Sequence, residues 1–271
     1  MAVAERVDPE HLADLERIKN FRLMDDDFMT ICFDGDIKCT QLVLRIILEM
    51  PDLVVLEVRT QVLVANLLDR SVRLDVLARD DQGRRINIEI QREDKGAGSH
   101  RARYHASIMD AHLLEKSKDF QDLPEVYVVF ITENDVMGLG EPLYHIERSI
   151  RESGQPFGDG SHILYVNGAY RGPSDLGRLM HDFSCPKPDE MYFHELADRT
   201  RFYKEEKEGV GSMCKVLEEM REECEKKGRE EGREETKIKN AKEMLADNVA
   251  IEKVARYSGL SLDEVLKLQK A

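Results

Sequence analysis

Hydrophobic and polar positions change their period several times along the chain, and each period predicts a type of element. Residues 38–50 are apolar on most sides, which predicts a buried helix that ends at Pro51. Helical spacing also predicts helices at residues 99–116, 174–182 and 190–203. Runs rich in β-branched and aromatic residues predict strands at residues 53–58, 62–65, 72–78, 86–90, 126–132, 144–150 and 162–166. This alternation indicates an α/β (α+β) domain, with a mixed sheet flanked by helices.

Two of these strands flank the polar segment Asp80-Asp-Gln-Gly83, which predicts a β-hairpin. Gly83 suits the positive φ angle that such a turn requires near its end. With the turn centred on Gln82, one face of the hairpin is apolar throughout, as packing on a core requires. The pairs expected on that face are Val76 with Ile88 and Leu74 with Ile90.

The opposite face of the same hairpin carries charged and polar residues. In this register Asp75 meets Glu89, and Arg73 meets Gln91. Opposed side chains have Cβ atoms about 5 Å apart, so two carboxylates repel unless a proton or a cation lies between them. Mg²⁺ suits such a gap and can activate water against a phosphodiester. The alternative is that the acids lie on a solvent-exposed face and that Arg73 neutralises them.

The composition excludes some classes of protein, among them disordered and membrane-spanning chains. The 271 residues carry a net charge of −14, and 41% of them are hydrophobic, which is too many for a disordered chain. No apolar run approaches the roughly 18 residues of a membrane span. Between Arg70 and Arg103, however, nine basic residues outnumber six acidic ones. A local excess of three positive charges can bind phosphate, although a solvated surface of mixed charge is an equal alternative.

Cysteine usage and short motifs exclude several further classes. The five cysteines are scattered and never form Cys-x-x-Cys, which argues against a disulfide framework or a zinc ribbon and fits reduced thiols in a cytoplasmic protein. The N-terminus lacks a basic start followed by an apolar stretch, so no secretory signal is expected. Without a P-loop or a Gly-x-Ser-x-Gly elbow, an ATPase or a serine hydrolase is unsupported.

The composition changes after Tyr203. In residues 204–242, 23 of 39 residues are charged, and Gly228-Arg-Glu-Glu is followed directly by a second Gly-Arg-Glu-Glu. This stretch predicts a charged helical connector through which the chain could form a homo-oligomer. Residues 243–271 predict a small helical hairpin, with a capping box at Ser261 and Glu264. Half of a DNA-reading helix-turn-helix is the alternative for this hairpin. The expected domains are therefore 1–203, 204–242 and 243–271.

Taken in order, the motifs resemble those of the PD-(D/E)xK nuclease superfamily. Asp75 is followed by Glu89-x-Gln91 on the next strand and then by Arg101-Ala-Arg-Tyr104 on a helix. From about Asp25 to the charged tail, the residues more closely resemble those of the Rpn family of recombination-promoting nucleases, also labelled transposases. Other matching segments are Phe28-Met29 with Asp34 downstream, Asn87-Ile, Gly96-Ala-Gly98, Phe130-Ile-Thr-Glu-Asn-Asp135, Tyr144-His-Ile, Asp159-Gly-Ser-His-Ile163, Tyr165-Val-Asn-Gly168 and Leu179-Met-His-Asp-Phe183.

The resemblance implies a restriction-endonuclease-like core that cuts DNA with Mg²⁺ (or Mn²⁺) in recombination or mobile-element biology. Asp75, Glu89 and the backbone carbonyl of Ile90 would hold the ion. Gln91 stands where the wider superfamily has Lys, so it can orient water or phosphate but adds no positive charge. The superfamily often adds an acid from the first core helix, for which Glu49 is the first candidate and Asp36 the second.

Arg73, Arg101, Arg103 and Tyr104 are the candidates for contacts with the DNA backbone. Ser99 is expected to cap the helix and so to aim its first turn at phosphate. The alternative is that Arg101 and Arg103 pair with nearby acids while Tyr104 packs on the sheet. For the whole protein, the alternatives are a nuclease fold that binds DNA with little or no catalysis, and an assembly module built on residues 204–242.

Overall fold

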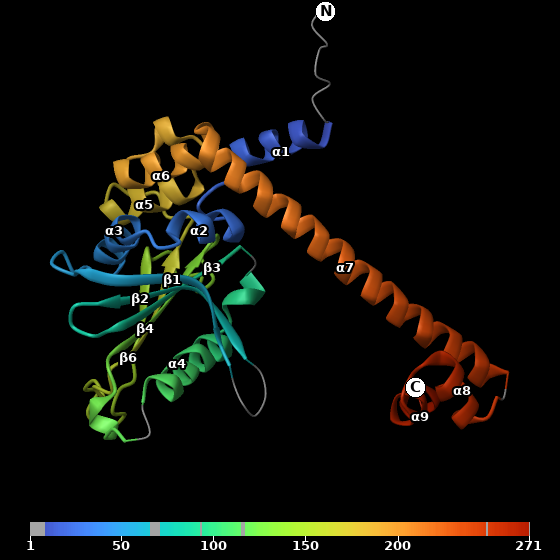
Figure 1. The fold of residues 1–271 in the computed structure, drawn as a ribbon. Helices are drawn as coiled ribbons and strands as arrows, with labels where there is room; N and C mark the ends of the chain where they lie inside the picture. The colour runs from blue at the N-terminus through green and yellow to red at the C-terminus, as the bar shows by residue number, and fades with distance from the viewer. Residues whose placement is uncertain (1–8, 66–70, 93, 115–116, 248, 271) are drawn as a thin grey trace, which may run out of the picture. The chain divides into compact units, whose positions relative to one another are not determined.

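Figure 1 shows the fold in a computed structural model, which describes residues 9–65, 71–92, 94–114, 117–247 and 249–270. The chain forms two compact units, Met1–Val210 and Gly211–Ala271. The first unit holds the sheet and the helices that cover it. The second holds most of one long helix and two short ones.

The first unit is built on a six-stranded mixed sheet with strand order β1-β2-β3-β4-β6-β5. The parallel pairs β3–β4 and β4–β6 form its centre, and the other neighbours are antiparallel. The mixed sheet flanked by helices confirms the expected fold class. Residues 53–58 and 62–65 were expected as separate strands, but they belong to one long strand. The strands are β1 (Val55–Val64), β2 (Val72–Asp80), β3 (Arg85–Gln91), β4 (Val126–Thr132), β5 (Leu143–Ile146) and β6 (Ser161–Asn167).

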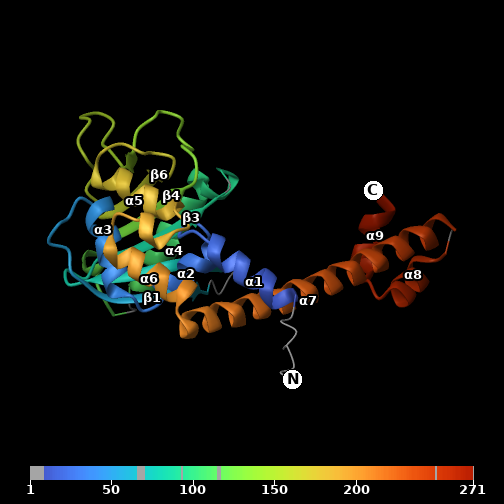
Figure 2. The same ribbon diagram turned by 90° about the horizontal axis from the view of Figure 1, so that it is seen from above.

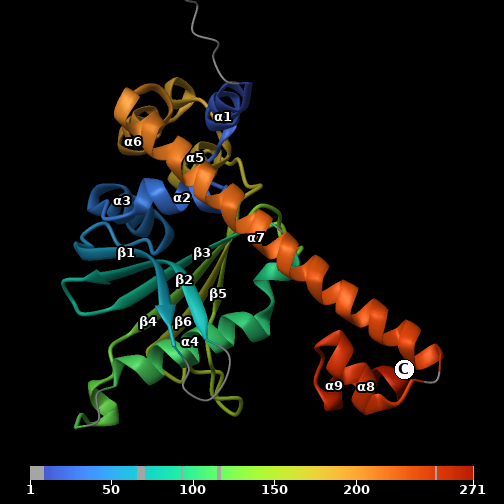
Figure 3. The same cartoon turned by 45° about the vertical axis from the view of Figure 1, so that its right-hand side comes forward.

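Helices cover both faces of this sheet (Figures 1 and 3). On one face lies α4 (Ser99–Leu113), whose Ala102, Ala106 and Met109 pack with Val128 and Phe130 of the central strand. The small side chains let the helix approach closely, and each large apolar side chain buried there contributes about 1.5–3 kcal/mol. The expected cap at Ser99 is wrong, because Gly98 is the N-cap residue and Ser99 the first residue of the helix.

A second group of helices covers the other face, as the view from above shows (Figure 2). The core on this side joins Phe33, Val43 and Phe183 to Val76 and Ile88 of the sheet. Because both faces are covered, all seven residues of β4 are buried. The first unit also contains α1 (Pro9–Asn20), and the helices of this second group are α2 (Asp26–Phe33), α3 (Ile37–Ile47), α5 (Asp175–Ser184) and α6 (His194–Glu205).

The predicted hairpin is present as β2, a tight turn and β3. Gly83 has φ +84, which fits the expectation for the turn. The buried carboxylate of Asp80 accepts hydrogen bonds from the N–H groups of Gln82 (3.0 Å) and Arg84 (2.8 Å), so it fixes the turn from inside. Val76 pairs with Ile88, which confirms the expected register.

The second unit contains most of α7 (Lys207–Ala246), together with α8 (Ile251–Ser258) and α9 (Leu262–Lys270). The tandem glycines do not interrupt α7. Gly259, with φ +73, ends α8, and Ser261 with Glu264 forms the predicted capping box before α9. A small core of Ala241, Val254, Leu260 and Val265 holds the three helices together. No helix among the described residues is long and apolar enough to span a membrane.

Candidate active site

The ladder between β2 and β3 opens at Asp75. Its last backbone pair is Val76–Ile88, so the pairing of Leu74 with Ile90 expected from the sequence is not part of it. Carboxylates take the place of the missing ladder bonds. The N–H of Asp75 donates to Oε1 of Glu89 (3.3 Å), and the N–H of Ile90 donates to Oδ2 of Asp75 (3.2 Å). The two acids are thereby fixed side by side.

Both acids are buried. Asp75 is 8% exposed and Glu89 is 0% exposed, so the interpretation that they lie on a solvent-facing surface is wrong. Burial, and after it the charges of Glu89 and Asp26, raises the pKa of Asp75 to about 8. Two carboxylates this close in a dry site favour a shared proton or a bound cation.

Glu89 is held by three side chains. Asn87 donates from Nδ2 to Oε1 (3.0 Å), and Arg101 reaches Oε2 with Nη2 (3.0 Å). The Nδ1 atom of His105 lies 3.5 Å from Oε1. Because Arg101 donates from Nε to Nε2 of this histidine (3.3 Å), we assign the histidine proton to Nδ1, facing the carboxylate. Oδ1 of Asn87 is buried and has no hydrogen-bond partner within the described structure.

Gln91 lies beside this group at the end of β3. Its Oε1 accepts a hydrogen bond from Nη1 of Arg101 (3.3 Å), which also donates to the carbonyl of Gly96 (3.2 Å). A Cβ atom at Gly96 would lie 1.8 Å from Oε1 of Gln91, so a larger residue there would force the end of the Gln91 side chain to move. One guanidinium therefore contacts both Glu89 and Gln91.

Asp26, the first residue of α2, is a third acid whose charge acts on the pair. Its pKa is raised by burial first and then by Asp27 and Glu89, while Arg101 and Arg73 act in the opposite direction. The sequence did not single out Asp26, because α2 itself was not predicted. The available signal was its place beside Asp25, where the family resemblance begins.

The donors at this site fit a hard cation. Among the described residues, no group of three or more His, Cys, Asp or Glu side chains is arranged to hold a metal ion. A structural zinc ion commonly takes four nitrogen or sulfur ligands, whereas Mg²⁺ is often bound by one or two carboxylates and several waters. The buried carboxylates of Asp75 and Glu89 therefore fit Mg²⁺ better than a structural zinc ion.

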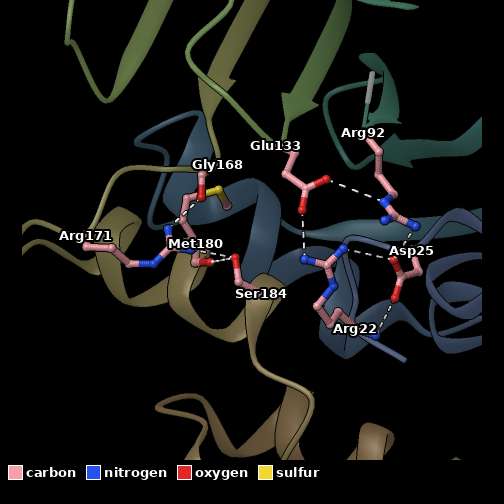
Figure 4. A network of polar contacts seen from close by, with 8 residues as sticks. All are labelled: Arg22, Asp25, Arg92, Glu133, Gly168, Arg171, Met180 and Ser184. Atoms are coloured by element: carbon pink, nitrogen blue, oxygen red, sulfur yellow. Dashed lines mark hydrogen bonds and ion pairs between the residues drawn. The ribbon is translucent and has the colours of Figure 1, made fainter. Parts of the chain in front are cut away.

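A ring of ion pairs lies beside the site, where the strands end (Figure 4). Arg22 contacts Glu133 (2.8 Å) and Asp25 (3.2 Å), and Arg92 contacts the same two acids at 3.4 and 3.0 Å. Arg92 follows Gln91, and Asp25 precedes Asp26. The ring therefore ties the start of α2 to the ends of β3 and β4.

The two candidates for an additional acid lie elsewhere. Glu49 is exposed, with φ +54, just after α3. Asp36 caps α3 by accepting the N–H of Cys39 (2.8 Å), and it pairs with Arg199 at 3.3 Å. In the described structure neither carboxylate contacts Asp75 or Glu89.

The remaining candidates differ in exposure. Arg73 and Arg103 are exposed, Arg101 is engaged with Glu89, and Tyr104 packs against the core under α4. The structure thus brings together four of the predicted residues, which are Asp75, Glu89, Gln91 and Arg101. It adds Asn87 and His105, which the hairpin register and the sequence spacing could not assign to Glu89.

Comparison with known proteins gives one match. Residues 47–167 match the family described as PD-(D/E)XK nuclease family transposase. No curated protein and no solved structure matches the chain significantly. The matched segment runs from the end of α3 to the end of β6, so it contains Asp75, Glu89, Gln91 and Arg101, while Asp26 lies outside it. By this match residues 47–167 belong to the PD-(D/E)XK nuclease family transposases, the Rpn-like family that the motifs resemble.

Proposed function

We propose that the protein is a metal-dependent endonuclease that hydrolyses phosphodiester bonds in DNA, in recombination or mobile-element biology. The observation that carries the proposal is the buried pair Asp75 and Glu89, in which the pKa of Asp75 is raised to about 8. A fold gains no stability from two adjacent buried acids, whereas a divalent cation is attracted to them. Family membership supports the nuclease class.

Asp75, Glu89 and the backbone carbonyl of Ile90 would hold Mg²⁺ or Mn²⁺. A divalent ion bound there supplies Lewis-acid chemistry, which activates water and stabilises charge on the phosphate. Asn87 and His105 orient Glu89 from behind. Such outer partners typically matter almost as much as the ligands they hold.

Gln91 and Arg101 together would take the role that one lysine has in the wider superfamily. The amide of Gln91 can orient water or the scissile phosphate but brings no charge. Arg101 lies within hydrogen-bond distance of both Gln91 (3.3 Å) and Glu89 (3.0 Å), so it brings a positive charge to the same place. Charge placed where the phosphate becomes more negative lowers the barrier to cleavage. Arg73, Arg103 and Tyr104 are proposed to contact the DNA backbone around this site.

The direct test is nicking of supercoiled plasmid by the full chain, in Mg²⁺, in Mn²⁺ and in EDTA. We expect metal-dependent nicking that Asp75→Ala abolishes and that Asp198→Ala, a change at an exposed acid of α6, leaves intact. Arg101→Lys, which keeps the charge, should retain more of the cutting rate than Arg101→Met.

Other outcomes decide against the proposal. Nicking that survives in Asp75→Ala places the chemistry elsewhere. Plasmid binding without nicking by the wild-type protein favours the second candidate, a nuclease fold that binds DNA without cutting. The observation that favours this candidate is the neutral Gln91 in the position of the lysine.

A further inference from the structure

Three arginines gather at the turn end of the hairpin, away from the candidate active site. Arg79 of β2 and Arg85 of β3 are directly opposed across the ladder. Arg59, on the neighbouring strand β1, pairs with the residue two positions before Arg79. We call these three residues the arginine cluster. Because alternate residues of a strand share a face, Arg85 lies on the same face of the hairpin as Glu89, and its partner Arg79 shares that face.

The charge of the arginine cluster is only partly neutralised. Glu57 pairs with Arg59 (2.5 Å) and with Arg79 (3.4 Å), so one carboxylate serves two guanidinium groups. Asp80, the next acid along β2, is already paired with Arg84 at 2.5 Å. In the part of the chain that the structure describes, no carboxylate lies within ion-pair distance of Arg85.

This arrangement disfavours the folded state. Like charges directly opposed across an antiparallel ladder are destabilising. Arg85 is also partly buried. Burial first, and then the charges of Arg79 and Arg59, lower the pKa of Arg85, while Glu57 and Asp80 act in the opposite direction without cancelling the shift. A site that concentrates positive charge at a cost to folding is expected where an anion binds.

We infer that Arg59, Arg79 and Arg85 bind the phosphate backbone of the nucleic acid, at a second contact separate from the candidate active site. Arg79 lies four positions after Asp75 along β2. This corresponds to about 13 Å, or roughly the rise of four base pairs of duplex DNA. Guanidinium groups recognise phosphate by paired hydrogen bonds and carry no sequence information, so the contact is independent of sequence. This inference rests on the proposed function, since it takes nucleic acid as the partner.

The test measures binding and leaves cutting aside. A fluorescent DNA duplex is titrated with the full chain in EDTA at several salt concentrations, and fluorescence anisotropy gives the binding constant. Each phosphate contact that is lost should flatten the plot of log K against log salt by about 0.9. We expect Arg79→Ala with Arg85→Ala to flatten the slope by about 1 to 2 and to weaken binding at least tenfold at low salt.

Two control variants distinguish the effect of the arginine cluster on binding from the effects of net charge and of folding. Arg79→Lys with Arg85→Lys keeps both charges and should keep the slope. Arg151→Ala with Arg178→Ala removes two exposed arginines of the same unit and should leave the slope unchanged. Since the opposed charges repel, the melting temperature should stay the same or rise in the cluster variant. If the double alanine variant fails to fold, Arg85→Gln alone should still flatten the slope by about 1.

Several results would overturn the inference. One is an unchanged slope in the cluster variant, and another is an equal loss in the Arg151 and Arg178 control. If the wild-type protein nicks plasmid while the slope does not respond to the cluster, the proposed function stands and this inference fails. If the wild-type protein neither binds nor cuts DNA, both fail.

Discussion

At the scale of single residues, Asp75 and Glu89 are two buried carboxylates whose negative charges repel each other. Their carboxylates replace backbone ladder bonds and are both buried. Asn87, Arg101 and His105 all hold Glu89, whereas Asp75 receives only a backbone hydrogen bond from Ile90 among the contacts described. The raised pKa of Asp75 therefore makes its proton sensitive to pH and to a bound metal.

This asymmetry predicts how stability depends on pH without metal. The pKa of Asp75 is about 8 in the folded protein and about 3.9 when unfolded. Between these values the folded state keeps a proton that the unfolded state has lost, so the free energy of unfolding falls as pH rises. Asp75→Asn removes this effect, and its advantage over the wild type should grow by up to about 1.4 kcal/mol per pH unit.

Urea unfolding in EDTA at pH 5, 6, 7 and 8 measures this difference. Asp198→Asn, at an exposed acid, should run parallel to the wild type. Added Mg²⁺ should stabilise the wild type at pH 8 and leave Asp75→Asn unchanged, since only a ligand that binds the folded state stabilises it. Parallel curves for Asp75→Asn and the wild type would contradict the argument.

The residues that could be predicted were those fixed by local pairing. Asp75 and Glu89 followed from the hairpin register, which the turn at Gly83 sets within a few residues. Asp26 and His105 could not be placed in that way, because their relation to Glu89 comes from the packing of two helices on opposite faces of the sheet. Tertiary packing of this kind leaves no periodic signal in the sequence.

At the scale of elements, the strands were easier to predict than the first helices. The alternation in β2 and β3 and the apolar run of β4 mark the sheet clearly, whereas α2 has only eight residues, of which Phe28, Met29, Cys32 and Phe33 are buried on one face. Such a short segment gains little from helix propensity and depends on its tertiary contacts. The apolar stripe at this position spans fewer than two helical turns, which is too short to predict a helix by itself.

One buried lysine joins three of these elements. Lys204 of α6 donates from Nζ to the carbonyls of Lys19 (3.0 Å), Phe21 (2.5 Å) and Pro186. The first of these carbonyls lies in the last turn of α1, the second lies between α1 and α2, and the third lies on the loop after α5. The ammonium group also lies 5.2 Å from the centre of the Phe28 ring. Lys204 thus fixes the approach to α2, and with it the position of Asp26.

We expect Lys204→Met to reduce the free energy of unfolding by about 2–4 kcal/mol. Methionine is also unbranched and fills most of the space of the lysine stem, but it leaves buried carbonyl groups without a donor, and each such loss costs about 1–3 kcal/mol. Chemical denaturation measures the effect. Lys187→Met, at an exposed lysine in the same region, should stay within about 0.5 kcal/mol of the wild type. A neutral result for Lys204→Met would show that water replaces the ammonium group at no cost.

At the scale of the whole molecule, the boundary of the nuclease-like fold matters most. The sequence places it after Tyr203, whereas the contacts of the chain divide it after Val210. A chain that ended at Tyr203 would lack Lys204. The first turn of α7 also packs closely on α6, since a Cβ atom at Gly209 would lie 2.1 Å from the carbonyl oxygen of Phe202. We therefore propose that the folding unit extends to Val210.

The long helix beyond that boundary gains little stability on its own. Described ion pairs such as Lys215–Glu219 and Arg229–Glu225 are exposed and contribute about 0.2–0.5 kcal/mol each. Gly228 and Gly232 each cost about 1 kcal/mol relative to alanine, and both face open space. Pairing of α7 with a second copy of the chain would offset this cost, which supports the proposal that α7 mediates oligomer formation.

Truncation after Val210 tests both proposals together. We expect residues 1–210 to unfold cooperatively and to nick plasmid within a few-fold of the full-chain rate, because Asp75, Glu89, Gln91 and Arg101 all lie in this part. Sedimentation should show an oligomer for the full chain and a monomer for the truncated one. A full chain that is monomeric at micromolar concentration, with α7 helical by circular dichroism, would instead make α7 a solvated connector, because its own ion pairs would then suffice to hold it.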